Sequence, residues 1–456
     1  MGHTRWVNSP RGQIHSRLLR CDSSTAESLL IEALLSKNPI VRCGKKSLEL
    51  EKFVTLDDIR RGWHRSTQQY RTDVPLVKDD LIRSNPFSAV LTTFLEDKAV
   101  VAAGQSTLAG WLVATDNFKA TNPRDKIYGL LGVSSPAETT GIAADYKISV
   151  AELYSTTVAK HISRYQELVF LQFDNDNKNV KHGLPSWVQD YSNNSDEPRP
   201  GYVSFLPGLY AASGKDCWGR NKIFLNNQFP KKGFLEFHSR GFIVDTVVYA
   251  GGFKRVAQYR GIDPKERLTS IKERLESLKA NIMIWKQEAS KATPDPYSPR
   301  QTKNEAFWRT LMADRMKDWS RLPSDSENIY FETFMAAGDD VPPEFKESQP
   351  GTFDEDMKRM YVKPFTDAAV PRCHGRSFVI TSKGYIGLAP FKTEVGDLVC
   401  ILEGGTVPFV LRHAVDEEGN ILEHYAFIGE SYVHGIMDGE AVQKANETDV
   451  RRFVLK

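Results

Sequence analysis

Residues 121–132 read Thr-Asn-Pro-Arg-Asp-Lys-Ile-Tyr-Gly-Leu-Leu-Gly and carry the signals of a short buried helix. The side-chain oxygen of Thr121 or Asn122 can cap the start of such a helix. Pro123 suits the first helical position, where no N–H is needed. Asp125 falls in the first turn, where a negative charge meets the positive end of the helix. The pattern therefore predicts a helix that begins next to Pro123.

The same stretch has an apolar side and a marked end. Ile127, Leu130 and Leu131 are spaced as on one face of a helix, and Gly132 can adopt the left-handed conformation that often ends one. Arg124 and Asp125 stand beside this apolar run. We predict that the two charged residues clamp a neighbouring loop. A bidentate arginine–carboxylate bond is a strong local contact, and it serves a fold as readily as a functional site.

This stretch also carries a family resemblance, which continues along the chain. ATNPRDKIYGLLG, at residues 120–132, resembles the (A)TDPRDKIYALLGL signature of fungal heterokaryon incompatibility (HET) domain proteins. ADYKISVAELY at 144–154 is similar to the PDYxxSVxExY segment of that family, and LPSWVQDYS at 184–192 is similar to LPSWVPDWS. Three further segments, GYIGLAP, GDLVCILEGGTVPFVLR and GESYVHGIMDGEA, resemble its C-terminal portion. Together these motifs are specific, although each alone is weak.

Four residues of these motifs form a structural signature rather than a catalytic one. Trp187 stands in the extended segment Leu-Pro-Ser-Trp-Val at 184–188, and we predict that it packs in a core. Tyr128 lies within the predicted signature helix, next to the clamp formed by Arg124 and Asp125. The segment FWRTLMAD at 307–314 resembles the FWRTLxAD helix of the family.

The usual opening of the family domain is not found in residues 1–28. That opening contains a Tyr-x-x-Leu-Ser-Tyr-x-Trp-Gly strand and a Trp-Ile-Asp-x-x-Cys-Ile-Asn-Gln segment. We therefore expect the N-terminal third of the usual domain to be lacking, through real truncation, divergence or a wrong gene model. In the family this part is similar to Toll/interleukin-receptor folds, so the resemblance transfers to this chain no nucleotide-handling or cell-death role that is located in that part.

Composition indicates an ordinary soluble protein. The chain has 456 residues, 40% of them hydrophobic, and a net charge of +2, which gives no argument for a nucleic acid partner. No apolar run approaches the roughly 20 residues that span a bilayer, and the N-terminus lacks an apolar signal core. We expect a cytoplasmic protein. The five cysteines lie too far apart for a zinc motif and indicate reduced thiols: Cys21, Cys43, Cys217, Cys373 and Cys400.

Helix and strand patterns divide the chain into three predicted regions. Residues 1–192 form a truncated, mainly helical HET-like region. Residues 193–375 form a mixed α/β connecting region with a long amphipathic helix at 264–289. Residues 376–456 contain five short strands with glycine-rich turns, followed by a terminal helix, and predict a small β-barrel or curled antiparallel sheet. The predicted fold class is therefore α+β.

Local patterns predict further elements. Residues 168–171 indicate a short buried strand, and 222–225 with 234–248 indicate a hairpin or meander. Residues 323–352 are polar and predict a surface excursion. A helix beginning after Ser149 places His161 at its polar end. The long helix at 264–289 is predicted to turn one apolar stripe inward, made of Leu268, Ile271, Leu275, Leu278, Ile282 and Ile284.

The densest polar cluster lies between residues 430 and 440. In a strand, Glu430, Tyr432 and His434 would share one face, because side chains alternate. Such a set is a candidate for acid–base catalysis, since histidine titrates near neutrality. The alternative is a hydrogen-bonded strand end that packs on the helical part. The sequence contains no G-x-S-x-G, H-E-x-x-H or P-loop motif, and we expect no cofactor or metal.

The resemblance implies a function but no reaction. HET proteins trigger programmed cell death when unlike fungal individuals fuse, so we expect non-self recognition through regulated association, with protein partners or self-association and without a specific nucleic acid. An alternative is a HET-like enzyme or accessory factor in secondary-metabolite biosynthesis. In that case acid–base chemistry at Glu430, Tyr432 and His434 is the first to test. A third possibility is an inert remnant.

Overall fold

The computed structural model describes residues 13–15, 40–43, 46–49, 107–115, 120–172, 182–192, 209–214, 236–253, 264–316, 320–322, 328–336 and 353–456. The strand predicted at 222–225 lies outside these residues. The chain divides into two compact units, residues 1–150 with 191–194 and residues 151–190 with 195–456. Within the described ranges, no helix is both long enough and apolar enough to span a membrane.

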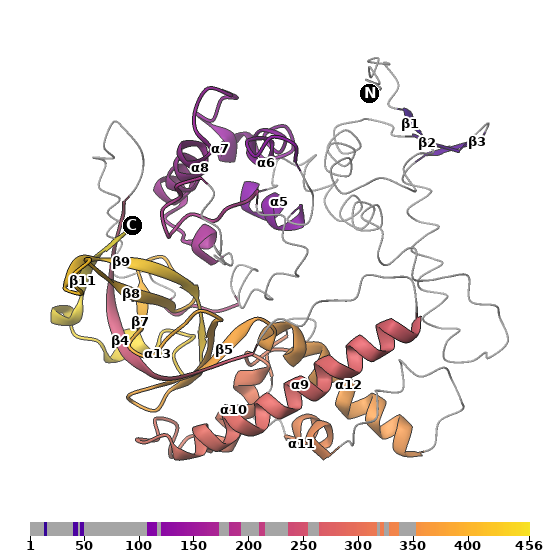
Figure 1. Cartoon of the computed structure of the whole chain (residues 1–456), viewed down its shortest axis with the longest axis vertical. Coiled ribbons are helices and arrows are strands. Elements are labelled where there is room, and N and C mark those ends of the chain that lie inside the picture. The colour runs from indigo at the N-terminus through magenta and orange to yellow at the C-terminus, as the bar shows by residue number, and fades with distance from the viewer. Residues whose placement is uncertain are drawn as a thin grey trace. The chain divides into compact units, whose positions relative to one another are not determined.

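The first unit contains a small sheet and a set of short helices (Figure 1). Strand β2 (Ile40–Cys43) pairs in parallel with β1 (Gln13–His15) and antiparallel with β3 (Lys46–Glu49). The helices are α5 (Leu108–Ala114), α6 (Asp125–Tyr128) and α7 (Pro136–Thr139). Helix α8 (Val150–Tyr165) begins at the end of this unit, where the sequence predicts a helix after Ser149.

The stretch 121–132 folds as one helical turn followed by tight turns. The side-chain oxygen of Asn122 accepts a hydrogen bond from the backbone N–H of Arg124 at 3.1 Å, which opens the segment. Ile127 and Leu130 are fully buried, as the pattern predicts. Gly132 does not have a positive φ, so the predicted left-handed helix end is wrong. The chain instead continues through i→i−3 backbone bonds, which satisfy the last carbonyls without a left-handed residue.

Arg124 and Asp125 both bond the loop that precedes α8. The Arg124 Nε donates to the Ile148 carbonyl oxygen at 2.7 Å. The Tyr146 hydroxyl donates to the Asp125 carboxylate at 2.7 Å. The two charged side chains thus hold the loop at separate points, so the geometry is not that of an arginine–carboxylate pair.

A charged side chain that the sequence does not single out lies buried in the same helix. Lys126 is 1% exposed, and its ammonium donates to the Thr115 carbonyl oxygen at 2.7 Å, just beyond the end of α5. A cation suits this position because the last carbonyls of a helix lack partners within it. Tyr128 donates from its hydroxyl to the Asp145 carbonyl oxygen at 2.8 Å. Helix α6 therefore connects α5 to the loop before α8.

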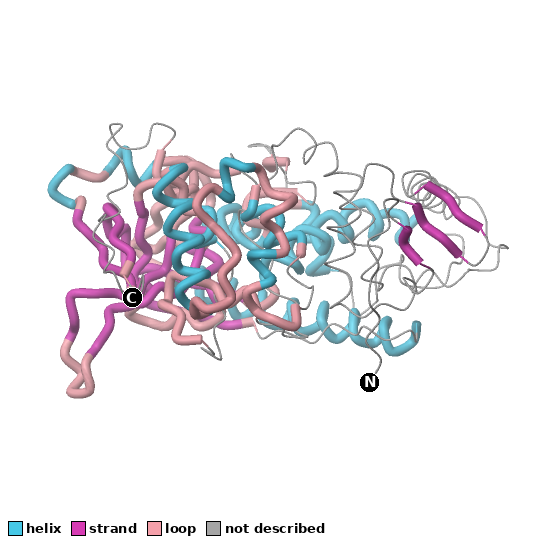
Figure 2. The backbone as a smooth tube through the Cα atoms, turned by 90° about the horizontal axis from the view of Figure 1, so that it is seen from above, coloured by secondary structure: helices cyan, strands magenta, loops and turns pink. Residues whose placement is uncertain are grey.

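Five strands of the second unit close into a barrel. Its order is β4 (Phe237–Gly252), β11 (Arg451–Leu455), β9 (Ile421–Glu430), β8 (Phe409–Val415) and β7 (Leu398–Leu402), and β7 pairs with β4 to close the ring. Beyond it, β4 pairs with β5 (Arg376–Thr381), which continues into β6 (Ile386–Pro390) and β10 (Tyr432–Val433). The magenta strands around the C-terminus in Figure 2 belong to this sheet. The predicted α+β class and small C-terminal barrel are confirmed.

Strand β4 is long enough to serve both the barrel and its extension. Its register shifts within residues 243–245 and 247–249, and such bulges bend a strand and increase its twist. At Gly241 a Cβ atom would lie 2.3 Å from the Ile401 carbonyl oxygen, so only glycine lets β7 approach this closely. The sequence expects a hairpin or meander ending at residue 248, whereas the structure has one strand that continues to Gly252.

Helices pack against β5 beside the barrel (Figure 1). The Trp285 ring stacks on Phe378 of β5, with centroids 5.5 Å apart and 16° between planes, and Phe307 meets the same ring edge-on at 5.5 Å. Aromatic side chains therefore join the helices to the sheet. Trp285 belongs to α9 (Pro264–Lys291) and Phe307 to α10 (Lys303–Leu311). Helix α12 (Phe353–Cys373) also contacts β5, and α11 (Ile329–Ala336) packs on α12.

The buried face of α9 differs in part from the predicted stripe. Leu278 and Ile282 are fully buried, as predicted, but Ile284 is 54% exposed. Ile284 lies two residues after Ile282, which places it about 200° around the helix. Trp285, three residues after Ile282, takes the inward position instead. The side chains of Leu268 and Ile271 lie outside the described residues.

Three further local predictions are wrong. Residues 169–172 form a 3₁₀ helix rather than a strand, because a short apolar run has no period that separates the two. His161 is buried, and its ring meets Phe170 edge-on at 4.7 Å. The predicted surface excursion at 323–352 contains α11, whose Phe331 and Phe334 are buried.

Candidate functional site

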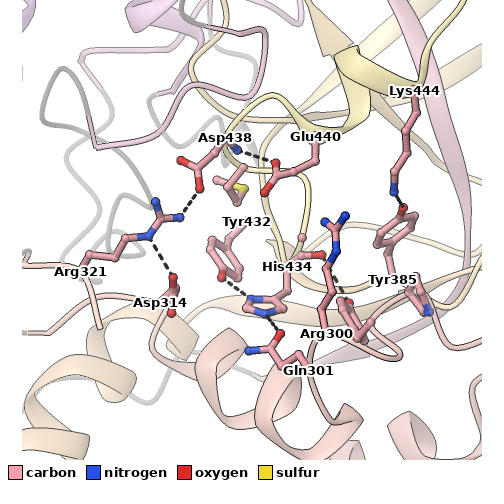
Figure 3. A pocket seen from close by; sticks show the side chains of 14 residues that line it. Arg300, Gln301, Asp314, Arg321, Tyr385, Tyr432, His434, Asp438, Glu440 and Lys444 are labelled. Atoms are coloured by element: carbon pink, nitrogen blue, oxygen red, sulfur yellow. Dashed lines mark hydrogen bonds and ion pairs between the residues drawn. The ribbon is translucent and has the colours of Figure 1, made fainter. Parts of the chain in front are cut away.

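A polar pocket of about 230 Å³ opens between the end of the sheet and the segment that joins α9 to α10 (Figure 3). Its walls also include the turn after α10 and the short helix α13 (Glu440–Lys444). The lining residues are Pro296, Tyr297, Arg300, Gln301, Asp314, Arg321, Tyr385, Tyr432, His434, Gly435, Met437, Asp438, Glu440 and Lys444. Two of the three predicted catalytic candidates, Tyr432 and His434, therefore line one cavity.

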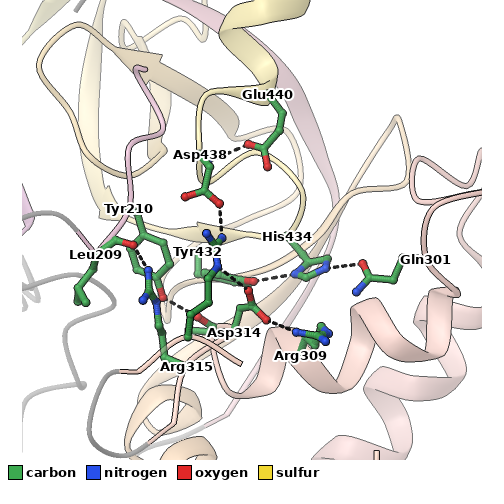
Figure 4. Close-up of polar contacts among 12 residues, drawn as sticks. Leu209, Tyr210, Gln301, Arg309, Asp314, Arg315, Tyr432, His434, Asp438 and Glu440 are labelled. Atoms are coloured by element: carbon green, nitrogen blue, oxygen red, sulfur yellow. Dashed lines mark hydrogen bonds and ion pairs between the residues drawn. The ribbon is translucent and has the colours of Figure 1, made fainter. Parts of the chain in front are cut away.

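His434 is hydrogen-bonded at both ring nitrogens (Figure 4). Its Nε2 lies 2.7 Å from the Gln301 side-chain oxygen, and its Nδ1 lies 2.7 Å from the Tyr432 hydroxyl. An amide oxygen only accepts, so the proton is on Nε2 and Nδ1 accepts from Tyr432. Burial lowers the pKa of His434 to about 4, and burial raises the pKa of Tyr432. At neutral pH both rings are therefore uncharged and fixed in orientation.

We expect His434 to make folding depend on pH. Between about pH 6.5 and about pH 4 the unfolded chain binds a proton on this histidine that the folded chain excludes. Proton binding then stabilises the unfolded state relative to the folded state. The free energy of unfolding therefore falls as the pH is lowered through this window. The His434→Gln variant lacks this contribution, and its unfolding free energy should fall less over the same window, as measured by urea denaturation.

His424→Gln is the matched control, because His424 lies on β9 and does not line the pocket. This control should keep the wild-type pH dependence. If wild type and His434→Gln lost unfolding free energy equally between neutral and acidic pH, His434 would not be held neutral in the folded chain.

Asp314 lies at a strained turn after α10. Ala313 and Asp314 have φ of 50° and 55°, in the left-handed region that residues other than glycine seldom adopt. The Asp314 carboxylate accepts from Arg309 at 2.7 Å and from Arg321 at 3.2 Å. Arg321 also forms an ion pair with Asp438, in the loop before α13 (Figure 4). This network links the helical side of the pocket to its barrel side.

Tyr210 and Arg315 make further contacts that hold the turn at Ala313 and Asp314. The Tyr210 hydroxyl donates to the Ala313 carbonyl oxygen at 2.5 Å, and burial raises the pKa of this tyrosine. The Arg315 guanidinium lies 4.8 Å from the centre of the Tyr210 ring and donates to the Leu209 carbonyl oxygen. Such contacts hold a backbone conformation that is unfavourable by itself.

Glu430 is placed away from the other two predicted catalytic residues. It is 2% exposed, and its carboxylate pairs with the buried guanidinium of Arg376 at 2.6 Å. Arg376 also donates to the Glu430 carbonyl oxygen at 3.2 Å. The prediction of one shared face is wrong because β9 ends at Glu430 and the strand alternation does not continue into β10. Glu430 therefore connects β9 to β5 instead of lining the pocket.

The remaining predicted residue, Trp187, lies in the second unit. It is 1% exposed, and its ring meets Phe237 of β4 at a centroid distance of 5.7 Å. Next to it, the Ser186 hydroxyl accepts from the backbone N–H of Phe427 at 2.9 Å. Trp187 therefore packs on the barrel and away from the pocket.

The described residues of the pocket provide hydrogen-bonding groups that the protein holds in fixed positions. The thiols of Cys373 and Cys400 are fully buried, and burial raises the pKa of Cys373 to about 12. The described part of the chain holds no group of three or more His, Cys, Asp or Glu that could bind a metal. Both ring nitrogens of His434 are hydrogen-bonded to protein side chains. The pocket can therefore recognise a polar molecule, with His434 as a fixed hydrogen-bonding group.

Sequence reasoning misses Gln301, Asp314 and Arg321, all of which line the pocket. Asp314 ends the segment 307–314 that the resemblance marks as a helix, although α10 already stops at Leu311. The sequence signal for Asp314 was that the resembled motif FWRTLxAD extends to an aspartate after the helix has ended. Gln301 stands 133 residues before its partner His434, and no local pattern connects the two.

Comparison with known proteins gives two matches. Residues 237–454 match the family model of the Het-6 beta-barrel domain. Heterokaryon incompatibility protein 6, OR allele, of Neurospora crassa is 26% identical over 361 residues, which cover 72% of this chain and 50% of that protein. The chain thus spans about half the length of this curated relative. No solved structure matches.

Proposed function

We infer that this chain, a HET-type protein that carries a Het-6 β-barrel and is related to a fungal heterokaryon incompatibility protein, acts in non-self recognition that leads to programmed cell death. The observation that carries the proposal is the similarity to heterokaryon incompatibility protein 6 over 72% of the chain. We propose that the mechanism is regulated association, with protein partners or with a second copy.

The contacts of the pocket support association rather than turnover of a substrate. A general base needs a free nitrogen or carboxylate oxygen within reach of the substrate. His434 uses both nitrogens within the protein, and the Asp314 carboxylate is held by Arg309 and Arg321. Outside the pocket, the third predicted candidate, Glu430, pairs with Arg376. These groups stabilise the fold, which suits a protein that works by binding.

Inducible expression in a filamentous fungal host tests the proposal. We expect colonies that express the wild-type chain to stop growing after induction, because the proposed activity kills the cells that carry it. The Glu430→Gln variant, which breaks the buried pair with Arg376, should restore growth. Glu288→Gln removes a partly exposed carboxylate from α9 and should arrest growth as wild type does.

Protein abundance is measured in the same cultures by immunoblot of the soluble fraction. Healthy colonies that contain abundant soluble wild-type chain would contradict the proposal. Arrest caused equally by wild type and by Glu430→Gln at the same abundance would also contradict it, because a toxic effect that does not need the fold is not recognition.

A further inference from the structure

We propose that the pocket binds a small organic carboxylate, with Arg300 and Lys444 as the groups that contact its anionic end. This binding goes beyond the function proposed above and does not depend on it. It rests on the size of the pocket, on the pairing of its charges and on the position of two cations.

The size of the pocket restricts its ligand. Its volume is about 230 Å³, which lies below the range of about 300–1,000 Å³ usual for drug-sized ligands. A nucleotide or a folded peptide segment is therefore too large for it. A molecule with few carbon atoms and several polar groups fits better.

Most charges in the pocket already have partners. Asp314 is held between Arg309 and Arg321, and Arg321 also pairs with Asp438. Burial keeps Tyr297, Tyr432 and His434 neutral, because it raises the pKa of the two hydroxyl groups and lowers the pKa of the imidazole to about 4. The charges left to face a ligand are those of Arg300, Lys444 and Glu440.

Arg300 and Lys444 are the two cations in a position to hold an anion. Both side chains are exposed. Among the described residues, the Arg300 guanidinium has no hydrogen bond or ion pair, whereas the Lys444 ammonium makes one long contact of 3.4 Å to the Tyr385 hydroxyl. In Figure 3 Arg300 rises from the segment before α10 and Lys444 descends from α13. A planar guanidinium matches the two oxygens of a carboxylate.

Glu440 refines the class of ligand. One of its carboxylate oxygens accepts from the backbone N–H of Asp438 at 2.8 Å, which fixes the side chain at the wall. Its negative charge favours a hydrogen-bond donor on the ligand, close to the cations. The pocket therefore fits a small carboxylate that also carries a hydroxyl or ammonium group, such as a hydroxy acid or an amino acid.

Titration calorimetry of the full chain tests this proposal with malate, citrate and glutamate as probes, and with acetate and sulfate for comparison. We expect at least one of the first three to bind. Arg300→Gln and Lys444→Gln should each weaken that binding at least about tenfold, since each removes a charged hydrogen-bond donor. Arg452→Gln is the matched control, because Arg452 is exposed on β11 and does not line the pocket.

Four outcomes would overturn the proposal. The first is that none of the three probes binds. The second is that binding survives unchanged in Arg300→Gln and Lys444→Gln. The third is that Arg452→Gln weakens binding as much as they do. The fourth is that acetate and sulfate bind as tightly as the probes, which indicates general attraction of anions rather than recognition of a hydroxy acid or an amino acid. Melting temperatures of the variants show whether they fold. Binding is measured on the purified chain, so these outcomes do not depend on whether expression of the chain arrests growth.

Discussion

Replacing Glu430 with glutamine should lower the free energy of unfolding by about 3–5 kcal/mol, the range found when one partner of a buried ion pair is removed. The Arg376 guanidinium is 3% exposed at its side chain and bonds both the carboxylate and the main-chain carbonyl of Glu430. Without the carboxylate, its positive charge stays buried next to a neutral amide. Urea denaturation of the purified chain measures the loss.

A matched control and a double variant separate this effect from general damage. Glu288→Gln breaks the exposed pair with Lys291 on α9 and should cost about 0.5 kcal/mol or less. The double variant Arg376→Met/Glu430→Leu removes both charges and should recover most of the stability, because an apolar pair of similar volume often replaces a buried ion pair. A cost for Glu430→Gln no larger than for Glu288→Gln would contradict the account of this pair.

Trp285→Ala should cost a similar amount, about 3–5 kcal/mol of unfolding free energy. The indole is 1% exposed, stacks on Phe378 of β5 and meets Phe253 edge-on at 6.3 Å. Its truncation leaves a cavity where α9 packs on the sheet, and a cavity adds to the loss of apolar burial. Urea denaturation followed by far-ultraviolet circular dichroism measures the change.

Ile284→Ala is the control for this prediction, because Ile284 is the neighbouring residue on the same helix and is 54% exposed. It should change the unfolding free energy by about 0.5 kcal/mol or less. The comparison also tests which face of α9 is buried. Equal losses for Trp285→Ala and Ile284→Ala would mean that the helix faces the sheet with the stripe the sequence predicts.

Sequence reasoning finds the barrel strands that local signals mark. Glycine-rich turns identify β5 to β9 within a few residues of their ends. Of these strands, β7 to β9 belong to the barrel, whereas β5 and β6 belong to the sheet that extends it. Sequence reasoning does not find that β4 belongs to the same barrel, because its partners β7 and β11 lie about 150 and 200 residues further along the chain, and register between distant strands leaves no local pattern. The domain boundaries proposed from sequence therefore stay a prediction.

In the candidate site, too, the sequence predicts the residues that lie close together in the chain but not their distant partners. Tyr432 and His434 are found from their local polar cluster, and they do meet in one pocket. Glu430 is assigned to the same face because strand alternation is assumed to continue past the end of β9. Gln301, which bonds His434, and Asp314, which lines the same pocket, come from segments more than 100 residues earlier in the chain. The sequence alone therefore does not predict contacts between residues that lie more than 100 positions apart.

The resemblance to fungal HET proteins is confirmed by the barrel match at residues 237–454 and by the similarity to the Neurospora crassa protein. The sequence motifs that suggest it lie partly within that barrel and partly in the signature helix α6. In both places the motif residues make contacts that hold the fold, such as Arg124 with Ile148 and Asp314 with Arg309.

The most direct test of the proposed function counts dying cells rather than colony size. Fungal compartments that express the wild-type chain are stained, after induction, with a dye that enters only cells whose membrane has failed. We predict that the stained fraction rises with wild type and with Ile284→Ala, and stays at the uninduced level with Trp285→Ala. Compartments that exclude the dye while they hold abundant, folded wild-type chain would contradict a role in cell death.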